Sequence, residues 1–447
     1  MKSTRWLCFG KYALVSWLFA AASAPMAAPL PPAGSAPSLE VEIDRLIEAV
    51  TPQVIAWRRD IHQHPELGNR EFRTAQLVAG LLRKWGYWVR TGVARTGVVG
   101  ILRGAKPGPV VALRADMDAL PVKELTGLPF ASTVKTVFDG QQVDVMHACG
   151  HDAHTAMLLG VAEVVSRIRD RLPGTVALIF QPAEDSAPAG EEGGAEPMIQ
   201  EGALRDPDVQ AIFGLHVLPL PSGVLSLRPG AQMASVNTFA ITVRGRQTHG
   251  AMPWTGVDPV VAAAQIVIGL QTIVSRQVDL TAAPAVITVG SIHGGVRSNI
   301  IPEQVELAGT IRCFDQEVLA NIQQRIRQTA TAIAQSVGAN ADVSFAAAGT
   351  PVVFNDPRLY QRLLPVLERI VGRNKLLTSN PLTIGEDFAC YQRQVPGLFI
   401  FLGIAPTGMD PQKVPFNHSP YFDVDEEALP TGMRVLAQLA LAFLQGG

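Results

Sequence analysis

The sequence predicts an α/β protein with a largely parallel sheet between helices, interrupted by a smaller α+β domain. Four short apolar runs lack the strict alternation of half-exposed strands, which is typical of strands buried on both faces. Helical patterns separate these runs, as in α/β folds. Between residues 235 and 348 the pattern changes to alternating strands and long helices. At 447 residues the chain is also long for one hydrophobic core.

The first 38 residues are expected to precede the folded part. Three basic residues come before an apolar stretch from Tyr12 to Ala22, and small residues follow to Ala28. We interpret residues 1–28 as a secretory signal peptide, because the apolar stretch is short for a bilayer span. Residues 29–38 would be a flexible lead-in. The expected location is therefore exported, periplasmic or secreted, with no stable membrane span after cleavage; the cleavage position stays open.

The other elements divide into a catalytic domain in two parts, residues 39–234 and 349–447, and an inserted domain, residues 235–348. Two helices are predicted in residues 38–89, separated by Arg58–Glu66, with Pro65 breaking the first. The buried strands are predicted at 110–113, 175–180, 211–215 and 398–402, and an Ala-rich helix at 426–444. The inserted domain is expected to be βαββαβ-like. Its first five elements, βαββα, are predicted as strands at 238–243, 285–292 and 305–313 and helices at 259–278 and 319–337.

Three histidines, one cysteine and one aspartate lie within eight residues, His147–His154. An apolar helical pattern follows, and Asp152 is placed to cap that helix. Cys149 and His151 would then lie just ahead of the helix N-terminus, where the helix dipole favours a thiolate and so a metal ligand. The C-x-H spacing is a weak signal by itself, because a buried, redox-inert cysteine gives the same pattern.

Polar residues follow three of the predicted strands at their carboxyl ends. The first strand leads to Arg114, Asp116 and Asp118, the second to Gln181, Glu184 and Asp185, and the third to His216. Ligand crevices of open α/β sheets lie at these ends. The groups are therefore expected to converge with Cys149 and His151, which favours a metal site. A net charge of −2 gives no reason to expect nucleic acid as a partner.

Nine ordered segments carry a resemblance that covers nearly the whole mature chain. The chain resembles the co-catalytic metallopeptidase superfamily of aminoacylases and carboxypeptidases, in particular its amidohydrolase branch of hippurate hydrolases and indoleacetyl-amino-acid hydrolases. The matching segments are R-R-D-I-H-Q-H-P-E at Arg58, R-A-D-M-D-A-L-P at Arg114, M-H-A-C-G-H-D-A-H-T at Met146, Q-P-A-E-D at Gln181, G-L-H-V at Gly214, T-H-G-A-M-P at Thr248, R-S-N-I-I-P at Arg297, G-E-D-F at Gly385 and N-H-S-P-Y-F at Asn417.

The resemblance implies a two-metal hydrolase and assigns its residues. Two divalent ions, zinc or manganese, would be bound by Cys149, His151, Asp185, His216 and His418, with Cys149 bridging them. Glu184 would be the general base for water that the metals activate. The substrate would be an N-acyl amino acid or a short peptide with a free carboxylate. The alternative, from another class, is a non-catalytic metal or small-molecule binding protein on the same scaffold.

The resemblance also gives the inserted domain a role as a lid and dimerisation domain. His249 would be catalytic, reaching into the partner's site of a homodimer, and Asn299 and Arg297 would bind substrate, Arg297 through its fork of donors to the carboxylate. The other interpretation of Thr248–Gly250 is a solvated turn, in which Gly250 permits the bend.

Several residues are expected to have other roles. His62 and His64 would order a turn; His147 and His154 would hydrogen-bond to the metal ligands; Asp116 and Asp118 would be structural or support the ligands. Glu386 and Asp387 would lie near the site. The family usually has two glutamates where this chain has Glu184 and Asp185, so Glu191 and Glu192 remain an alternative pair.

Overall fold

A computed structural model gives the structure, which describes residues 38–346 and 349–446. The predicted signal peptide and almost all of the predicted lead-in lie outside the described residues. The α-helices are α1 (Leu39–Gln63), α2 (Phe72–Lys84), α3 (His151–Arg167), α4 (Ala195–Gln200), α5 (Pro259–Gln277), α6 (Gln316–Ser336), α7 (Pro357–Val371), α8 (Phe388–Gln392) and α9 (Leu429–Leu444).

The larger sheet has eight strands in the order β1-β2-β6-β3-β7-β18-β8-β17. Its four central strands, β6, β3, β7 and β18, are parallel, and they contain the four predicted apolar runs. The mixed α/β fold is thus confirmed, with antiparallel strands added towards the edges. The bounds are β1 (Trp88–Val93), β2 (Gly97–Arg103), β3 (Lys106–Asp116), β6 (Pro173–Gln181), β7 (Ala211–Pro221), β8 (Leu225–Leu227), β17 (Leu376–Thr378) and β18 (Gly397–Ala405).

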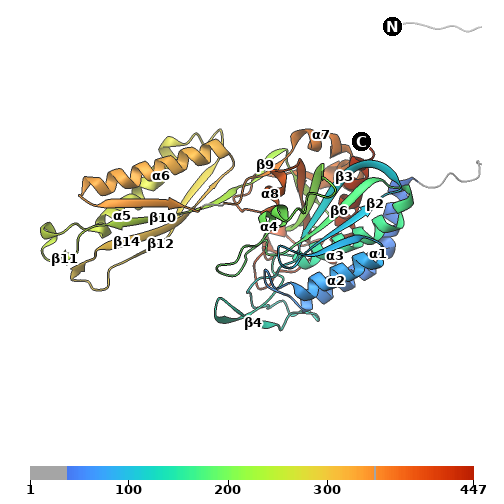
Figure 1. Cartoon of the computed structure of the whole chain (residues 1–447), viewed down its shortest axis with the longest axis horizontal. Coiled ribbons are helices and arrows are strands. Elements are labelled where there is room, and N and C mark those ends of the chain that lie inside the picture. Colours follow the sequence, from blue (N-terminus) through green and yellow to red (C-terminus); the bar gives the residue numbers. More distant parts are fainter. Residues whose placement is uncertain (1–37, 347–348, 447) are drawn as a thin grey trace, which may run out of the picture. The chain divides into compact units, whose positions relative to one another are not determined.

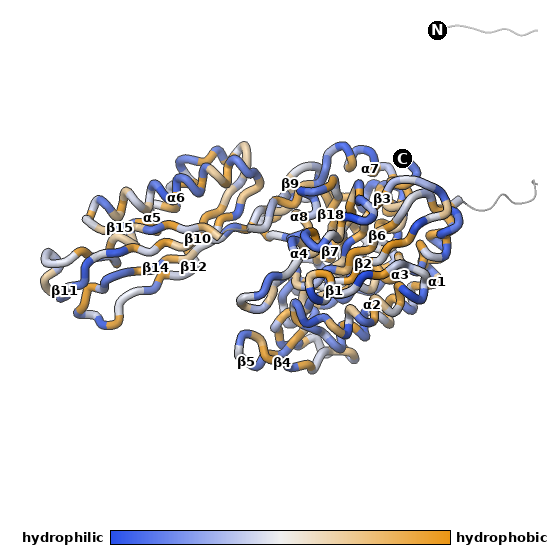
Figure 2. Tube along the Cα trace, in the orientation of Figure 1, coloured by the Kyte–Doolittle hydropathy of each residue, from blue (hydrophilic) through white to orange (hydrophobic). Residues whose placement is uncertain are grey.

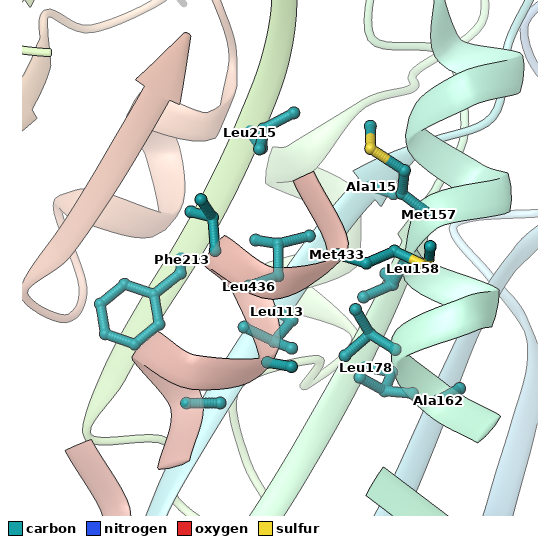
Figure 3. Close-up of a cluster of buried hydrophobic side chains, with 14 of the residues drawn as sticks. Leu113, Ala115, Met157, Leu158, Ala162, Leu178, Phe213, Leu215, Met433 and Leu436 are labelled. Atoms are coloured by element: carbon teal, nitrogen blue, oxygen red, sulfur yellow. The ribbon is translucent and has the colours of Figure 1, made fainter. Parts of the chain in front are cut away.

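Helices cover both faces of this sheet (Figure 1). Side chains of α1, α3 and α9 form one apolar core with the sheet, and α4 and α8 contribute to a second core on the other face. Figure 3 shows part of the first core, in which Leu113, Leu178 and Phe213 from neighbouring strands meet Leu158 of α3 and Leu436 of α9. Because these strands are buried on both faces, their sequences are continuously apolar.

The inserted segment forms its own sheet, antiparallel throughout, in the order β12-β14-β10-β15. Its strands are β10 (Ser235–Arg244), β12 (Ala285–Gly294), β14 (Gln304–Cys313) and β15 (Asn340–Phe345). Helices α5 and α6 share an apolar core with it, and α6 carries both hydrophilic and hydrophobic residues along its length (Figure 2). Of the described helices, α5 is the one long and apolar enough to cross a membrane, yet its Ile266 and Leu270 are buried in this core. The exact domain boundaries stay a prediction.

The remaining strands are short pairs. They are β4 (Lys135–Phe138) with β5 (Gln141–Asp144), β9 (Gly230–Met233) with β16 (Val353–Asn355), and β11 (Thr248–His249) with β13 (Ile300–Ile301). One boundary prediction was wrong: residues 58–63 belong to α1, which ends two residues before Pro65. The restriction that proline places on the preceding residue accounts for this end.

Candidate active site

The turn before α3 positions Cys149 and His151. Gly150 is the N-cap residue and has φ of 91°, a left-handed conformation that glycine adopts without strain. A Cβ on Gly150 would lie 2.3 Å from Val217, so the turn also needs the absent side chain. The prediction that Asp152 caps α3 was wrong. Its carboxylate instead accepts hydrogen bonds from Arg58 and His62, because both are buried beside it.

The structure brings five predicted ligands together from four segments of the sequence. Cys149, His151 and His216 form one group whose donor atoms all lie within 4.8 Å of one another. Cys149, Asp185 and His418 form a second such group. The sulfur belongs to both groups, so these five residues would suffice to hold two cations.

The orientation of the ligands also fits bound cations. The Nδ1 of His151 is 2.9 Å from the carbonyl oxygen of Asp118, and its Nε2 is buried with no hydrogen-bond partner. Oδ2 of Asp185, also buried and unpartnered, lies 3.9 Å from that Nε2. Two orphaned buried atoms facing each other indicate a cation site.

The backbone holds the other two histidines. His216 lies within β7, which continues past the predicted end to Pro221, and its Nδ1 is 2.9 Å from the carbonyl oxygen of Val217. Burial lowers the pKa of His216 to about 3, so its Nε2, 3.5 Å from the Cys149 sulfur, is free of a proton. His418 has φ of 73°, which is uncommon for a residue with a side chain, and its N–H donates to Ala148. Its Nε2 is 3.3 Å from Asp185.

The expected preference of Cys149 for the thiolate is wrong for the protein without metal. Burial, together with the negative charge of Asp185, raises the pKa of the Cys149 thiol to about 12. Desolvation in this fully enclosed position outweighs the helix dipole. A bound cation reverses this balance, because metal coordination deprotonates a thiol.

Glu184 lies beside the donor cluster, where β6 has ended. Its Oε2 is 4.0 Å from Nε2 of His151, and its Oε1 accepts from the Asp387 N–H at 3.4 Å. Burial and the charges of Glu386 and Asp185 raise the pKa of Glu184 well above its usual value. A carboxyl group whose pKa is raised in this way takes up a proton more readily than an ordinary glutamate, which suits a general base.

A buried network behind Glu184 was not foreseen from the sequence. Arg114 is 1% exposed and donates to Asp116 and Asp387, and its Nη2 is 2.9 Å from Glu386. The network holds together the carboxyl ends of β3 and β6 and the segment before α8. The signal that could have revealed it is a charged residue directly after a buried strand, since a buried arginine requires anionic partners.

Asn417, next to His418 in one of the matching segments, is a further residue of the site. Its side-chain amide donates to the carbonyl oxygens of Cys149 and Val217, at 3.0 and 3.2 Å. It therefore ties the loop that carries His418 to the segments that carry two other donors.

The supporting residues behave in part as expected. His154 contacts Asp116 at 2.6 Å and accepts from the Val217 N–H, so it bonds to neighbours of the ligands and not, as predicted, to a ligand. Asp118 supports the ligand His151, as expected. His147 makes no hydrogen bond to a ligand, contrary to the prediction, because neither of its ring nitrogens has a hydrogen-bond partner. His62 does not order a turn either: it lies in α1 and joins Asp152 to Glu124. His64 is exposed and contacts the carbonyl oxygen of Asp60.

Glu191 and Glu192 do not compete with Asp185. Glu191 accepts from Arg70 and Asn69, Glu192 is exposed, and neither belongs to a donor group in the described chain.

The three predicted residues of the inserted domain lie near one another but outside the donor groups. β11 pairs with β13, His249 opposite Ile300, and the Gly250 N–H donates to the carbonyl oxygen of Asn299. His249, Arg297 and Asn299 are exposed. The Nδ1 of His249 accepts from the Ala251 N–H, which is compatible with the solvated turn as well as with a functional role.

Thiol, imidazole and carboxylate donors, arranged for two cations beside a protonatable glutamate at the end of a parallel sheet, define a metal-dependent hydrolase. The chain belongs to the peptidase family M20/M25/M40, whose family model matches residues 112–442. It is 39% identical over 400 residues to thermostable carboxypeptidase 2 of Saccharolobus solfataricus, covering 89% of this chain and 97% of that protein. It is 39% identical over 395 residues to the IAA-amino acid hydrolase ILR1-like 4 of Arabidopsis thaliana, covering 88% and 86%.

A solved structure agrees with the fold. The YXEP protein of Bacillus subtilis, described as a dinuclear metal-binding peptidase of the M20 family, superposes with a TM-score of 0.74 at 35% identity, covering 89% of this chain and 99% of that one. The predicted family and the predicted enzyme class are thus confirmed.

Proposed function

We propose that this enzyme hydrolyses the amide bond between an acyl group and an amino acid with a free carboxylate, or the last peptide bond of a short peptide. The observation that carries the proposal is the pair of donor groups that share Cys149, with Glu184 beside them. The names of the relatives, a carboxypeptidase and an amino acid hydrolase, support both kinds of substrate.

Cys149, His151, Asp185, His216 and His418 would hold two divalent cations, zinc or manganese. When bound, the cations would acidify water and stabilise negative charge on the carbonyl oxygen of the substrate. Glu184 would take the proton from the attacking water and deliver it to the leaving amine, for which its raised pKa suits it. Arg114 and Asp387 would keep this carboxyl group in place.

The decisive test is Glu184→Gln, with Glu192→Gln as its control in the same loop. Glu184→Gln should keep both metal ions, measured by elemental analysis, and lower kcat by about 10²–10⁴-fold towards a panel of N-acyl amino acids and dipeptides. Glu192→Gln should retain full activity because its side chain is exposed. Full activity of Glu184→Gln would remove the proposed base. Reconstitution with zinc or manganese separately would identify the more active metal.

We also propose a homodimer formed through the inserted domain, with His249 acting in the partner's site and Asn299 and Arg297 contacting the substrate. Mixing two inactive variants, Glu184→Gln and His249→Ala, tests this. A mixed dimer would pair an intact Glu184 with an intact His249 across the interface, so activity should return. If His249 acts only within its own chain, mixing should restore nothing.

The location is a separate proposal. Removal of residues 1–28 and export would place the enzyme in the periplasm or outside the cell. Cell fractionation with N-terminal sequencing of the purified protein tests it, and a cytoplasmic protein that still begins at Met1 would contradict it.

A further inference from the structure

The chain turns sharply between the end of β6 and the proposed general base. β6 ends at Gln181, and Glu184 and Asp185 follow within four residues. The turn includes Ala183, whose φ of 51° lies in the left-handed region, where residues with a side chain are uncommon. Such a conformation persists only where the surrounding structure fixes it. The residues that fix Ala183 therefore decide where the next two side chains lie.

Glu71 supplies a contact that fixes Ala183. Its Oε1 accepts a hydrogen bond from the Ala183 N–H at 2.9 Å, and its Oε2 accepts one from the hydroxyl of Thr96. Glu71 is fully buried, and it stands at the N-cap position of α2 without capping that helix through its side chain. Burial of a carboxyl group is costly. Because this one is neither exposed to water nor used by its own helix, its bond to Ala183 indicates a role at the site.

The proposed base depends on this contact more than its neighbour Asp185 does. The hydrogen bond that the Asp387 N–H donates to Glu184 is long, at 3.4 Å, so it holds the side chain only weakly. The Asp185 N–H, by contrast, donates to the carboxylate of Asp118 at 3.0 Å. Loss of the Glu71 contact should therefore displace Glu184, while the proposed metal ligand Asp185 keeps an anchor of its own.

We propose that Glu71 is a positioning residue for the hydrolysis: it holds Ala183 in its left-handed conformation and thereby directs Glu184 towards the donor groups. This inference rests on the proposed function. The contact needs an acceptor oxygen and not a charge. Burial and the charge of Asp118 raise the pKa of Glu71 to about 8, and the carboxyl group offers such an oxygen with or without a proton. Glutamine should therefore replace Glu71, and an apolar residue should not.

Two substitutions of Glu71 test the proposal on the metal-loaded, full-length enzyme, with N-acetyl and N-benzoyl amino acids as substrates. Glu71→Met removes the acceptor and should lower kcat by about 10–100-fold, with little change in KM or in metal content. Glu71→Gln can still accept from the Ala183 N–H and can donate to Thr96, so it should retain most of kcat. Full kcat for Glu71→Met, or an equally low kcat for both variants, would overturn the inference.

Glu66→Met is the matched control, because it makes the same change in the same segment. The carboxylate of Glu66 accepts from the N–H groups of Arg73 and Thr74 in the first turn of α2, so it stabilises this helix and not the turn at Ala183. Glu66→Met should lower the unfolding midpoint and leave kcat of the folded enzyme unchanged. If Glu66→Met and Glu71→Met both lost kcat in proportion to stability, Glu71 would have a structural role only.

Hydrogen exchange provides a measurement that does not depend on activity. In the metal-free protein, peptides that span residues 178–186 should exchange faster in Glu71→Met than in the unaltered protein or in Glu71→Gln, because the Ala183 N–H has lost its acceptor. Equal protection in all three proteins would overturn the inference. If Glu71→Met does not fold, Thr96→Val takes its place: it removes the hydroxyl that orients Glu71, and it should lower kcat and protection by smaller amounts. Unchanged kcat and protection in that variant would also overturn the inference.

Failure of this inference is distinguishable from failure of the proposed function. Full activity of Glu71→Met together with an inactive Glu184→Gln would overturn only the role of Glu71. If the unaltered, metal-loaded enzyme hydrolysed no N-acyl amino acid and no dipeptide, the proposed function itself would be refuted, and the role of Glu71 with it.

Discussion

Arg58 and Arg59 are neighbours on α1 that differ mainly in burial, and they allow a sharp prediction about stability. Both are close to Glu426, and both guanidinium groups lie 5.2 Å from the ring centre of Phe130. The side chain of Arg58 is 1% exposed and that of Arg59 is 50% exposed. Arg58 also forms ion pairs with the fully buried Asp152 and with Asp423, both at 2.8 Å.

We expect Arg58→Met to lower the free energy of unfolding by about 3–5 kcal/mol, because it leaves Asp152 as a buried charge without its main counter-charge. Arg59→Met should cost about 0–1 kcal/mol, as is usual for an exposed ion pair. Methionine keeps an apolar stem of similar length, so the lost charge dominates the difference. Urea unfolding at pH 7, followed by far-UV circular dichroism, measures both values. Adding Asp152→Asn to Arg58→Met should recover part of the loss. Equal losses for the two arginine variants would refute the reasoning.

Two other predictions concern pH and metal. Burial disfavours the protonated form of His62, but Asp152 and Glu124 outweigh it and raise the pKa of His62 from 6.5 to about 9, equivalent to roughly 3 kcal/mol. That stabilisation is complete below pH 6.5 and disappears as the pH rises through 9. His62→Gln should therefore lower the free energy of unfolding, measured with urea, by more at pH 6 than at pH 10. A loss of unfolding free energy that grows with pH would contradict this. The reference state is protein with free metal at a hundred times its Kd. Relative to that state, removing the metals with a chelator should lower the unfolding free energy by about 3 kcal/mol or more, and adding metal again should restore the unfolding free energy. As a control, Cys313→Ser, in the inserted sheet, should lose as much unfolding free energy on chelation as the unaltered protein does. If the unfolding midpoint stays the same after the metals are shown to be gone, metal binding does not stabilise the fold.

The central strands could be predicted because burial on both faces leaves a continuous apolar run in each. β8 and β17 could not, because three-residue strands have no measurable period and form only where a neighbour offers an edge. The grouping of Glu184, Asp185 and His216 followed from one rule, that polar residues after parallel strands meet at one edge of the sheet.

Other features of the site depend on tertiary contacts that local patterns do not contain. Asp152 has the residue type and place of a helix cap, but the buried Arg58, 94 positions away, is a stronger partner. The Cys149 pKa depends on how completely the fold encloses the sulfur, which spacing does not reveal. Likewise, Phe401 looks like an ordinary core residue in sequence, and only the register of β7 with β18 places it beside a donor.

The packing of α1 against α9 has a consequence for the order in which the protein can assemble during synthesis. These two helices stand near opposite ends of the described chain, and β18, at the centre of the large sheet, is also made late. At ordinary translation speeds the ribosome needs roughly 20–70 s to pass from the end of α1 to the start of α9. Until then the first helix can pack against α3 but lacks α9, and the sheet lacks a central strand. The inserted sheet has no such delay, because all four of its strands come from residues 235–345.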